Sequence, residues 1–322
     1  MQEPLFRKFL PQIKAAYDGK LKDAQGNPIL LEKPSDYFRV LDAWGVPNNG
    51  VCYLSQMLHD MRTGVLPPLT KEDLKSFGKD IRLAPGLPDF FTALREKWKD
   101  ACDLRFYIVS VGLREMIEGN PLAGYVDGIF ASELVSLGGL FNGKQEHAVD
   151  AIRDIVTPFS KIRDALEICK GGRHKVDMLM SGSEFELDYR NVISIGDGLS
   201  DVSQFAYLRA KGATIICVYK DGDRESYYKA SNQSLLRERV DLLAPRDYTV
   251  GNDLWIEVNN FIRRALERQC DDLSPQELDL YKKGRLKNKM VIRDIREHLD
   301  RCSYCQGSHT FRFISPQVTR LN

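Results

Sequence analysis

The sequence predicts an α/β protein in which a parallel sheet is covered by helices on both faces. Between residues 85 and 268, short continuous apolar runs alternate with helical segments, a pattern typical of strands that are buried on both sides. In residues 1–84 apolar residues recur at helical spacing, and no buried strand is expected there. Residues 269–322 are expected to form a small helical hairpin. We therefore predict three regions with these boundaries.

Two features predict helices in the first region. Thr70 and Asp73 stand three residues apart before Leu74, and a hydroxyl and a carboxylate at this spacing can form a capping box that starts a helix. Further upstream, apolar residues recur every three or four positions, which indicates a helix with one buried face. These residues are Val51, Leu54, Met57, Leu58 and Met61.

The second region begins where Pro85-Gly86 breaks the chain. A helix carrying Phe90, Leu94 and Trp98 on one face is expected to follow. Four apolar runs are then short enough and sufficiently rich in β-branched residues to be strands. They span residues 105–110, 126–131, 192–195 and 213–218.

Composition argues against a membrane or nucleic-acid partner. The formal charge is +1, so no global field attracts either surface. No stretch approaches the roughly 18 apolar residues that span a bilayer, and the N-terminus has no apolar signal region. We expect a cytoplasmic protein with its seven cysteines reduced or bound to metal. The residues from Tyr281 onward hold ten Lys and Arg against three Asp and Glu, but no base-reading motif accompanies them.

The segment from Val192 to Asp201 predicts a magnesium site. It reads as a buried strand that ends in a Gly-rich turn with two carboxylates, Asp197 and Asp201. Ligands bind at the carboxyl ends of strands in open α/β sheets, and Mg²⁺ prefers oxygen ligands. Gly196 and Gly198 would let the backbone approach a ligand closely. The alternative is a plain strand-to-helix turn in which Asp201 caps the helix.

Ser110 and Lys161 are candidate phosphate ligands. Ser110 ends a predicted strand just before Val111 and Gly112, where a hydroxyl and backbone N–H groups can hold an anion. Lys161 opens a predicted helix upstream of the Gly-rich turn and could neutralise phosphate charge. Taken alone, Ser110 could equally be a simple cap, and Lys161 an ordinary surface lysine.

In this order, the three motifs resemble the second, third and fourth motifs of the haloacid-dehalogenase-like (HAD) phosphohydrolases. The resemblance covers roughly residues 1–268 and points to a phosphoserine-phosphatase-like branch. It rests on Val111–Gly119, Ala131–Glu133, Lys161–Gly171, Arg239–Asp241 and Asp247-Tyr248 in addition to the motifs.

The resemblance implies a HAD-type Rossmann-like sheet and a role for each candidate residue. Asp197 would bind Mg²⁺ directly, and Asp201 would fix the waters of the ion. Ser110, with Gly112, would hold the transferring phosphoryl group of a small phosphorylated substrate, and Lys161 would stabilise its charge. Residues 1–84 would be a helical cap that closes over the site and selects the substrate.

The nucleophile that this family requires is absent from the expected place. The first motif of the family is a strand ending Asp-x-Asp, whose first Asp attacks phosphorus and whose second is the general acid and base. Within residues 1–84, the sequence around Asp42 comes nearest to matching this motif. However, Asp42 has no second Asp two residues on, and its surroundings predict a helix. The segment Gln2–Phe6 resembles the stretch that follows the first motif.

Without its central first strand, the expected sheet has a gap between the strands that end near Ser110 and Ile195. Those strands could close up, or another segment could fill the gap. We expect instead that the natural product begins upstream of Met1, so that the chain is truncated and inactive as written. The alternative is a catalytically inactive scaffold that acts as a binding or regulatory protein.

The tail carries a possible zinc site. His298, Cys302 and Cys305 have the spacing His-x3-Cys-x2-Cys, which can place three ligands around one Zn²⁺, with His309 or Cys270 as the fourth. The segment from Leu273 to Gln306 resembles the zinc-finger-like helical hairpin of anti-sigma factors, which implies a protein partner. The alternative is a plain helical hairpin with reduced thiols.

Overall fold

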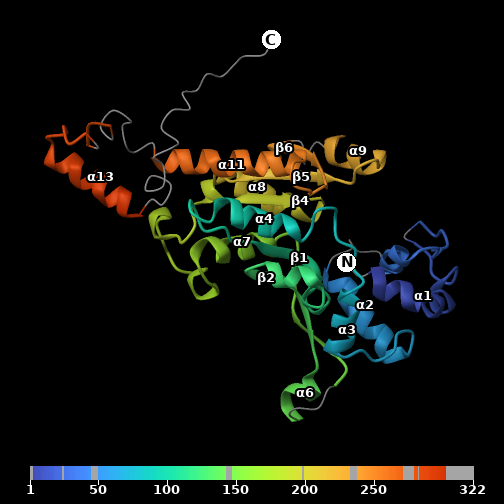
Figure 1. Ribbon diagram of the computed structural model, residues 1–322. Coiled ribbons are helices and arrows are strands. Elements are labelled where there is room, and N and C mark those ends of the chain that lie inside the picture. Colours follow the sequence, from blue (N-terminus) through green and yellow to red (C-terminus); the bar gives the residue numbers. More distant parts are fainter. Residues whose placement is uncertain are drawn as a thin grey trace.

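The computed structural model describes residues 3–23, 25–44, 50–142, 147–197, 199–232, 238–270, 279–281 and 283–301. Within them the protein has mixed α/β structure with parallel strands, which confirms the predicted class. Figure 1 shows the strands in the centre, the N-terminal helices on one side and helix α13 (Lys289–Arg301) at the other end. In the described part of the chain, no helix is both long enough and apolar enough to cross a membrane.

The N-terminal region is helical, with α1 (Glu3–Tyr17), η1 (Pro34–Trp44), α2 (Gly50–Thr63) and α3 (Lys71–Gly78). The capping box predicted at the start of α3 is confirmed. The Thr70 hydroxyl accepts from the Asp73 N–H at 3.1 Å, and the Asp73 carboxylate accepts from the Thr70 N–H at 2.8 Å. Among the described residues before Ala84, the only extended pairing is an isolated bridge between Lys22 and Pro28.

A buried carboxylate joins three of these helices. Asp60 on α2 has no exposed surface. It accepts hydrogen bonds from the Tyr37 hydroxyl on η1 at 2.6 Å, from the Gln56 amide at 2.8 Å and from the Tyr17 hydroxyl on α1. A buried charge is tolerated only when hydrogen bonds satisfy it, so this network fixes α1, η1 and α2 to one another.

The core of the helical region continues into the α/β part. Its buried cluster includes Leu5 and Phe6 together with Leu113, Met116 and Leu134. Helix α3 packs closely on α5 (Arg114–Glu118). A Cβ on Gly78 would stand 2.0 Å from the Met116 carbonyl oxygen, and one on Gly119 would stand 1.9 Å from the Lys75 carbonyl oxygen. Only glycine allows two backbones to approach this closely.

The strands form two three-stranded sheets. In the first, β1 (Tyr107–Leu113) is parallel to β2 (Gly128–Val135), and β2 is antiparallel to β3 (Ala151–Asp154). In the second, β4 (Ile193–Gly196), β5 (Thr214–Tyr219) and β6 (Leu242–Pro245) are parallel in that order. The four predicted strands are confirmed within a few residues, whereas β3 and β6 were not predicted.

The two sheets do not pair with each other. Within the described ranges, β1 stands at the edge of one sheet and β4 at the edge of the other. The possibility that these strands close up is therefore wrong for this structure. Among the described residues, β1 and β4 therefore each have one edge without a strand neighbour.

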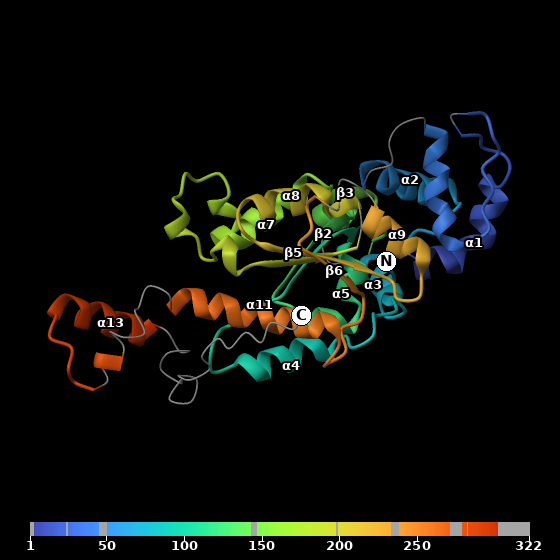
Figure 2. The ribbon, with the colours of Figure 1, turned by 90° about the horizontal axis from the view of Figure 1, so that it is seen from above.

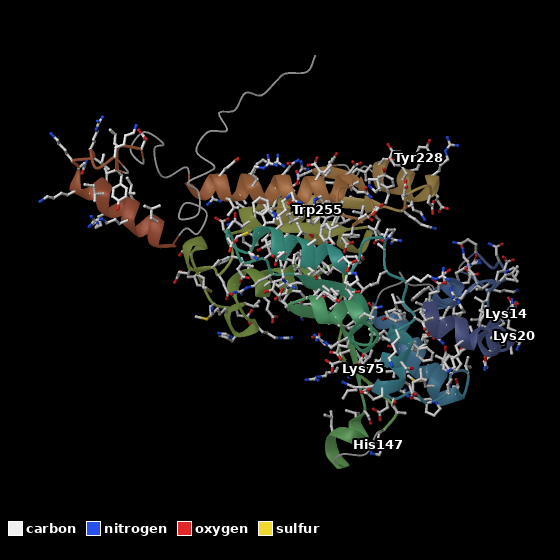
Figure 3. All side chains as sticks on the ribbon, viewed as in Figure 1. Lys14, Lys20, Lys75, His147, Tyr228 and Trp255 are labelled. Carbon is white, nitrogen blue, oxygen red and sulfur yellow. The ribbon has the colours of Figure 1, made fainter. Side chains whose placement is uncertain are left out.

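Helices cover both faces of the second sheet. Helices α4 (Asp89–Trp98) and α11 (Asp253–Cys270) pack on one face, and α7 (Ser160–Lys170) and α8 (Val202–Ala210) on the other. Figure 2 shows these two pairs of helices on opposite sides of the strands. Trp255, labelled in Figure 3, lies on α11 and contacts Phe90 of α4 with ring centroids 5.8 Å apart.

The remaining elements connect these layers. Strands β2 and β3 extend into an arm that carries α6 (Leu137–Asn142) and projects from the body (Figure 1), with His147 near its outer end (Figure 3). The other elements are η2 (Pro121–Tyr125), η3 (Arg173–Lys175), η4 (Gly182–Glu184), η5 (Tyr189–Asn191), η6 (Leu199–Asp201) and α9 (Arg224–Asn232).

Replacing Asp60 should destabilise the helical region strongly. We expect Asp60→Ala to lower the free energy of unfolding by ~2–4 kcal/mol, because three buried donors lose their acceptor. Tyr37→Phe removes one donor and leaves Asp60 with two, so it should cost only ~1 kcal/mol. Urea denaturation followed by circular dichroism measures both values. An Asp60→Ala cost no greater than that of Tyr37→Phe would contradict the shared role of the carboxylate.

A second buried carboxylate makes stability depend on pH. Glu115 on α5 is buried, and one of its oxygens has no hydrogen-bond partner among the described residues. The other accepts from the Leu134 N–H at 3.3 Å and lies 3.7 Å from the Lys71 ammonium, which itself donates to Glu133 at 2.7 Å. Burial raises the pKa of Glu115 above its ordinary value of 4.5.

Because the folded state holds the Glu115 proton more tightly than the unfolded state, stability should fall as the pH rises from 4.5 through the raised pKa. Glu115→Gln cannot ionise, so this fall should disappear and the variant should gain stability relative to the parent at neutral pH. Urea midpoints measured across this range test the prediction. Glu118→Gln on the same helix, whose side chain is 37% exposed against 2% for Glu115, is the control. An equal slope in the parent and Glu115→Gln would refute it.

Candidate functional site

The candidate site lies at the carboxyl end of β4. Ile193 and Ile195 pack with α4 and α11, and the strand ends at Gly196, directly before Asp197. A Cβ on Gly196 would lie 2.6 Å from an Asp201 carboxylate oxygen and 2.8 Å from the Phe205 ring. Glycine is therefore required at this position for space, and the Asp201 carboxylate lies directly over the strand end.

Lys161 and Asp201 form a buried ion pair. The ammonium group, on a side chain only 4% exposed, donates to the carboxylate of Asp201 and lies 3.5 Å from the Ser200 hydroxyl oxygen. The alternative of a surface lysine is therefore wrong. Asp201 does occupy the N-cap position of α8, as the helix-cap alternative expected, but its side chain makes no capping hydrogen bond there.

Two reciprocal hydrogen bonds between Thr157 and Ser160 fix the turn that precedes Lys161. The Thr157 N–H donates to the Ser160 hydroxyl at 2.7 Å, and the Ser160 N–H donates to the Thr157 hydroxyl at 3.1 Å. This arrangement satisfies backbone donors at the helix start, which would otherwise be unpaired. Helix α7 then packs against β1 and α8, and so brings Lys161 toward both strand ends.

Ser110 is buried, and its hydroxyl accepts from the Gly112 N–H at 3.0 Å. The expectation that Ser110 ends its strand needs correction, since β1 continues to Leu113 after an irregularity in register between Ser110 and Leu113. The helical region reaches β1 directly, because the Tyr53 hydroxyl on α2 donates to the Val111 carbonyl at 3.3 Å. That contact was not predicted from the sequence.

Asp197 is paired with a residue that sequence reasoning did not select. The guanidinium of Arg246, which follows β6, lies 3.1 Å from the Asp197 carboxylate, and the two side chains are 41% and 57% exposed. Tyr248 belongs to the same loop. Burial, together with the charge of Asp197, raises the pKa of Tyr248 to about 12, so this hydroxyl is neutral at physiological pH. The sequence offered no signal for Arg246, because β6 was not predicted.

The site offers oxygen ligands that suit a hard cation, but only two carboxylates supply them. No group of three or more His, Cys, Asp or Glu side chains that could hold a metal ion is found within the described ranges. Asp197 and Asp201 offer carboxylate oxygens at one strand end, and Mg²⁺ commonly uses one or two protein carboxylates and retains several waters. Gly198, between them in sequence, lies outside the described residues.

Most of the predicted zinc ligands also lie outside the residues that the structure describes. Cys302, Cys305 and His309 are not among the described residues, and the side chains of His298 and Cys270 are not described although their backbones lie in α13 and α11. Helix α13 lies within the region 269–322 that was expected to be helical. Among the described residues, Cys102, Cys169 and Cys217 are free thiols.

Comparison with known proteins gives limited guidance. No protein-family model matches the chain. A curated protein of Borreliella burgdorferi (strain ATCC 35210 / DSM 4680 / CIP 102532 / B31), described as an uncharacterized protein, is 26% identical over 234 residues. The match covers 68% of this chain and 80% of that protein.

Gly196→Ala should disturb the Asp201 carboxylate. The added methyl group would overlap this carboxylate and the Phe205 ring, so we expect a loss of ~1–3 kcal/mol in the free energy of unfolding. Gly124→Ala is a matched control, because a Cβ there meets no atom within 4 Å. Chemical denaturation of both variants tests this, and equal midpoints would show that the strand end relaxes without cost.

Proposed function

We propose that this protein is a HAD-type phosphohydrolase of the phosphoserine-phosphatase-like branch, acting on a small phosphorylated substrate with Mg²⁺. The observation that carries the proposal is the buried contact between Lys161 and Asp201. It joins two motifs that are 40 residues apart at the carboxyl end of a parallel strand, where α/β proteins bind ligands. A chance surface lysine would not be buried in contact with a carboxylate.

Each residue would have a distinct task. Asp197 would hold Mg²⁺, and Asp201, fixed by Lys161, would orient the waters of the ion. The bound ion would neutralise the charge of the phosphoryl group. Ser110 would donate a hydrogen bond to a phosphoryl oxygen, and the Gly112 N–H, now engaged by that hydroxyl, would become available as a second donor. Lys161 would add positive charge at the buried side of the site.

The proposal requires a carboxylate nucleophile that the described strands do not supply. Asp42 lies in η1 and belongs to neither sheet. We infer that an extended segment ending Asp-x-Asp would lie between β1 and β4, where both neighbouring strands are sheet edges in the described residues. Its carboxylates would then reach the same end of the sheet as Ser110 and Asp197. Tyr53, which contacts Val111 next to Ser110 on β1, supports a role for the helical region in selecting the substrate.

A second candidate function is a non-catalytic scaffold. It is favoured by the observation that both carboxylates already have cationic partners, Lys161 and Arg246, so the site is close to neutral without any metal. In this case the tail, with the zinc hairpin expected at His298, Cys302, Cys305 and His309, would engage a protein partner.

Phosphatase assays on a chromogenic phosphoester distinguish the two functions. We expect the 322-residue chain to be no faster than its Asp197→Ala version, because among the described residues no strand ending Asp-x-Asp lies between β1 and β4. A longer chain, including any in-frame coding sequence ahead of Met1 that supplies an Asp-x-Asp strand, should turn over with Mg²⁺. Asp197→Ala or a chelator should reduce that rate by at least ~100-fold.

Two outcomes would count against this account. Mg²⁺-dependent turnover by the 322-residue chain itself, lost in Asp197→Ala, would show that another group in the chain is the nucleophile. Inactivity of both chains, with intact folding by circular dichroism, would favour the scaffold.

A further inference from the structure

Arg246 is held at the carboxyl end of the second sheet by its backbone. Its N–H donates to the Tyr219 carbonyl at 2.7 Å, which extends the pairing of β5 with β6 by one residue. Since β5 lies between β4 and β6, the side chain of Arg246 must cross the end of β5 to reach Asp197. That span is about two strand spacings, roughly 9–10 Å.

The acid next to Arg246 in the sequence and the acid at the start of β6 both have other partners. Asp247 accepts from the Thr249 N–H at 2.9 Å and from the Asn252 amide at 2.6 Å. Asp241, at the opposite end of β6, pairs with Arg209 at 3.0 Å. The guanidinium therefore spans the strand end to reach the carboxylate that the proposed function assigns to Mg²⁺.

The contact between Arg246 and Asp197 is weak enough to be exchanged. Both side chains are more than one-third exposed, and exposed ion pairs contribute only about 0.2–1 kcal/mol. The other carboxylate differs, because the Lys161–Asp201 pair is buried. One acid of the site is thus fixed permanently, and the other is held by a cation that can leave.

We propose that Arg246 is an internal counter-ion that competes with a divalent metal ion for the Asp197 carboxylate. This inference rests on the metal site of the proposed function. In the metal-free protein the guanidinium neutralises Asp197 and keeps the strand end in place. A bound divalent ion displaces the guanidinium from Asp197, because one exposed carboxylate cannot hold both cations in the same position without strong repulsion.

Removing the competitor should strengthen metal binding. Loss of the ion pair and of one nearby positive charge should tighten binding of Mn²⁺, used as a probe for Mg²⁺, by ~3- to 10-fold in Arg246→Gln. Arg246→Lys keeps the charge and should remain within about twofold of the parent. Arg209→Gln is the matched control, because Arg209 is 40% exposed and also pairs with an aspartate, but at the other end of the sheet.

Titration of Mn²⁺ into the full chain, with free ion measured by electron paramagnetic resonance, tests the proposal without any activity assay. Tighter binding in Arg246→Gln alone, abolished when Asp197→Ala is added, supports it. Equal affinities in the parent and Arg246→Gln, with binding still lost in Asp197→Ala, would overturn the role of Arg246 and leave the metal site intact. Binding that is absent, or unchanged by Asp197→Ala, would overturn the metal site and this inference together.

Discussion

The buried ion pair between Lys161 and Asp201 is the constraint on which the site depends. A buried charge whose partner is removed costs about 3–5 kcal/mol, so each of these side chains needs the other. The pair also links parts of the molecule that backbone hydrogen bonds do not join. Lys161 lies on α7, which packs on β1, while Asp201 lies over the end of β4. Together with α4, whose apolar face meets β4, β5 and the approach to β1, this contact holds the two sheets across their unpaired edges.

The electrostatic balance of the site follows from this geometry. Two carboxylates at one strand end would repel each other, but each is paired with a cation. Lys161 on α7 pairs with Asp201, and Arg246, from the far side of β5, pairs with Asp197. The difference in exposure separates their tasks. The Lys161–Asp201 pair sets geometry, because its side chains are only 4% and 12% exposed, whereas the side chains of the Arg246–Asp197 pair are 41% and 57% exposed. Each carboxylate of the site is thus balanced by a positive charge from the protein itself.

The sequence was informative where a pattern is local and less so where partners are distant. Continuous apolar runs identified β1, β2, β4 and β5, and the spacing of Thr70 and Asp73 identified a helix start. Strands β3 and β6 are four residues long, and they include charged residues or a proline, so neither has a strand signal of its own. The order of Ser110, Lys161 and Asp197 suggested one site, but the burial of Lys161 and the reach of Arg246 across β5 depend on tertiary packing that one sequence does not display.

The core shared by the helical region and the α/β part has a consequence for evolution. Inserted regions that only touch a catalytic core can be exchanged between relatives as modules, because little else has to change. Here, Leu113, Met116 and Leu134 are buried in the same cluster as Leu5 and Phe6, and two glycines bring the backbones of α3 and α5 into contact. A transplanted helical region would have to reproduce both the shape of this cluster and the glycine contacts. This region is therefore expected to change through single side chains rather than through replacement of the whole.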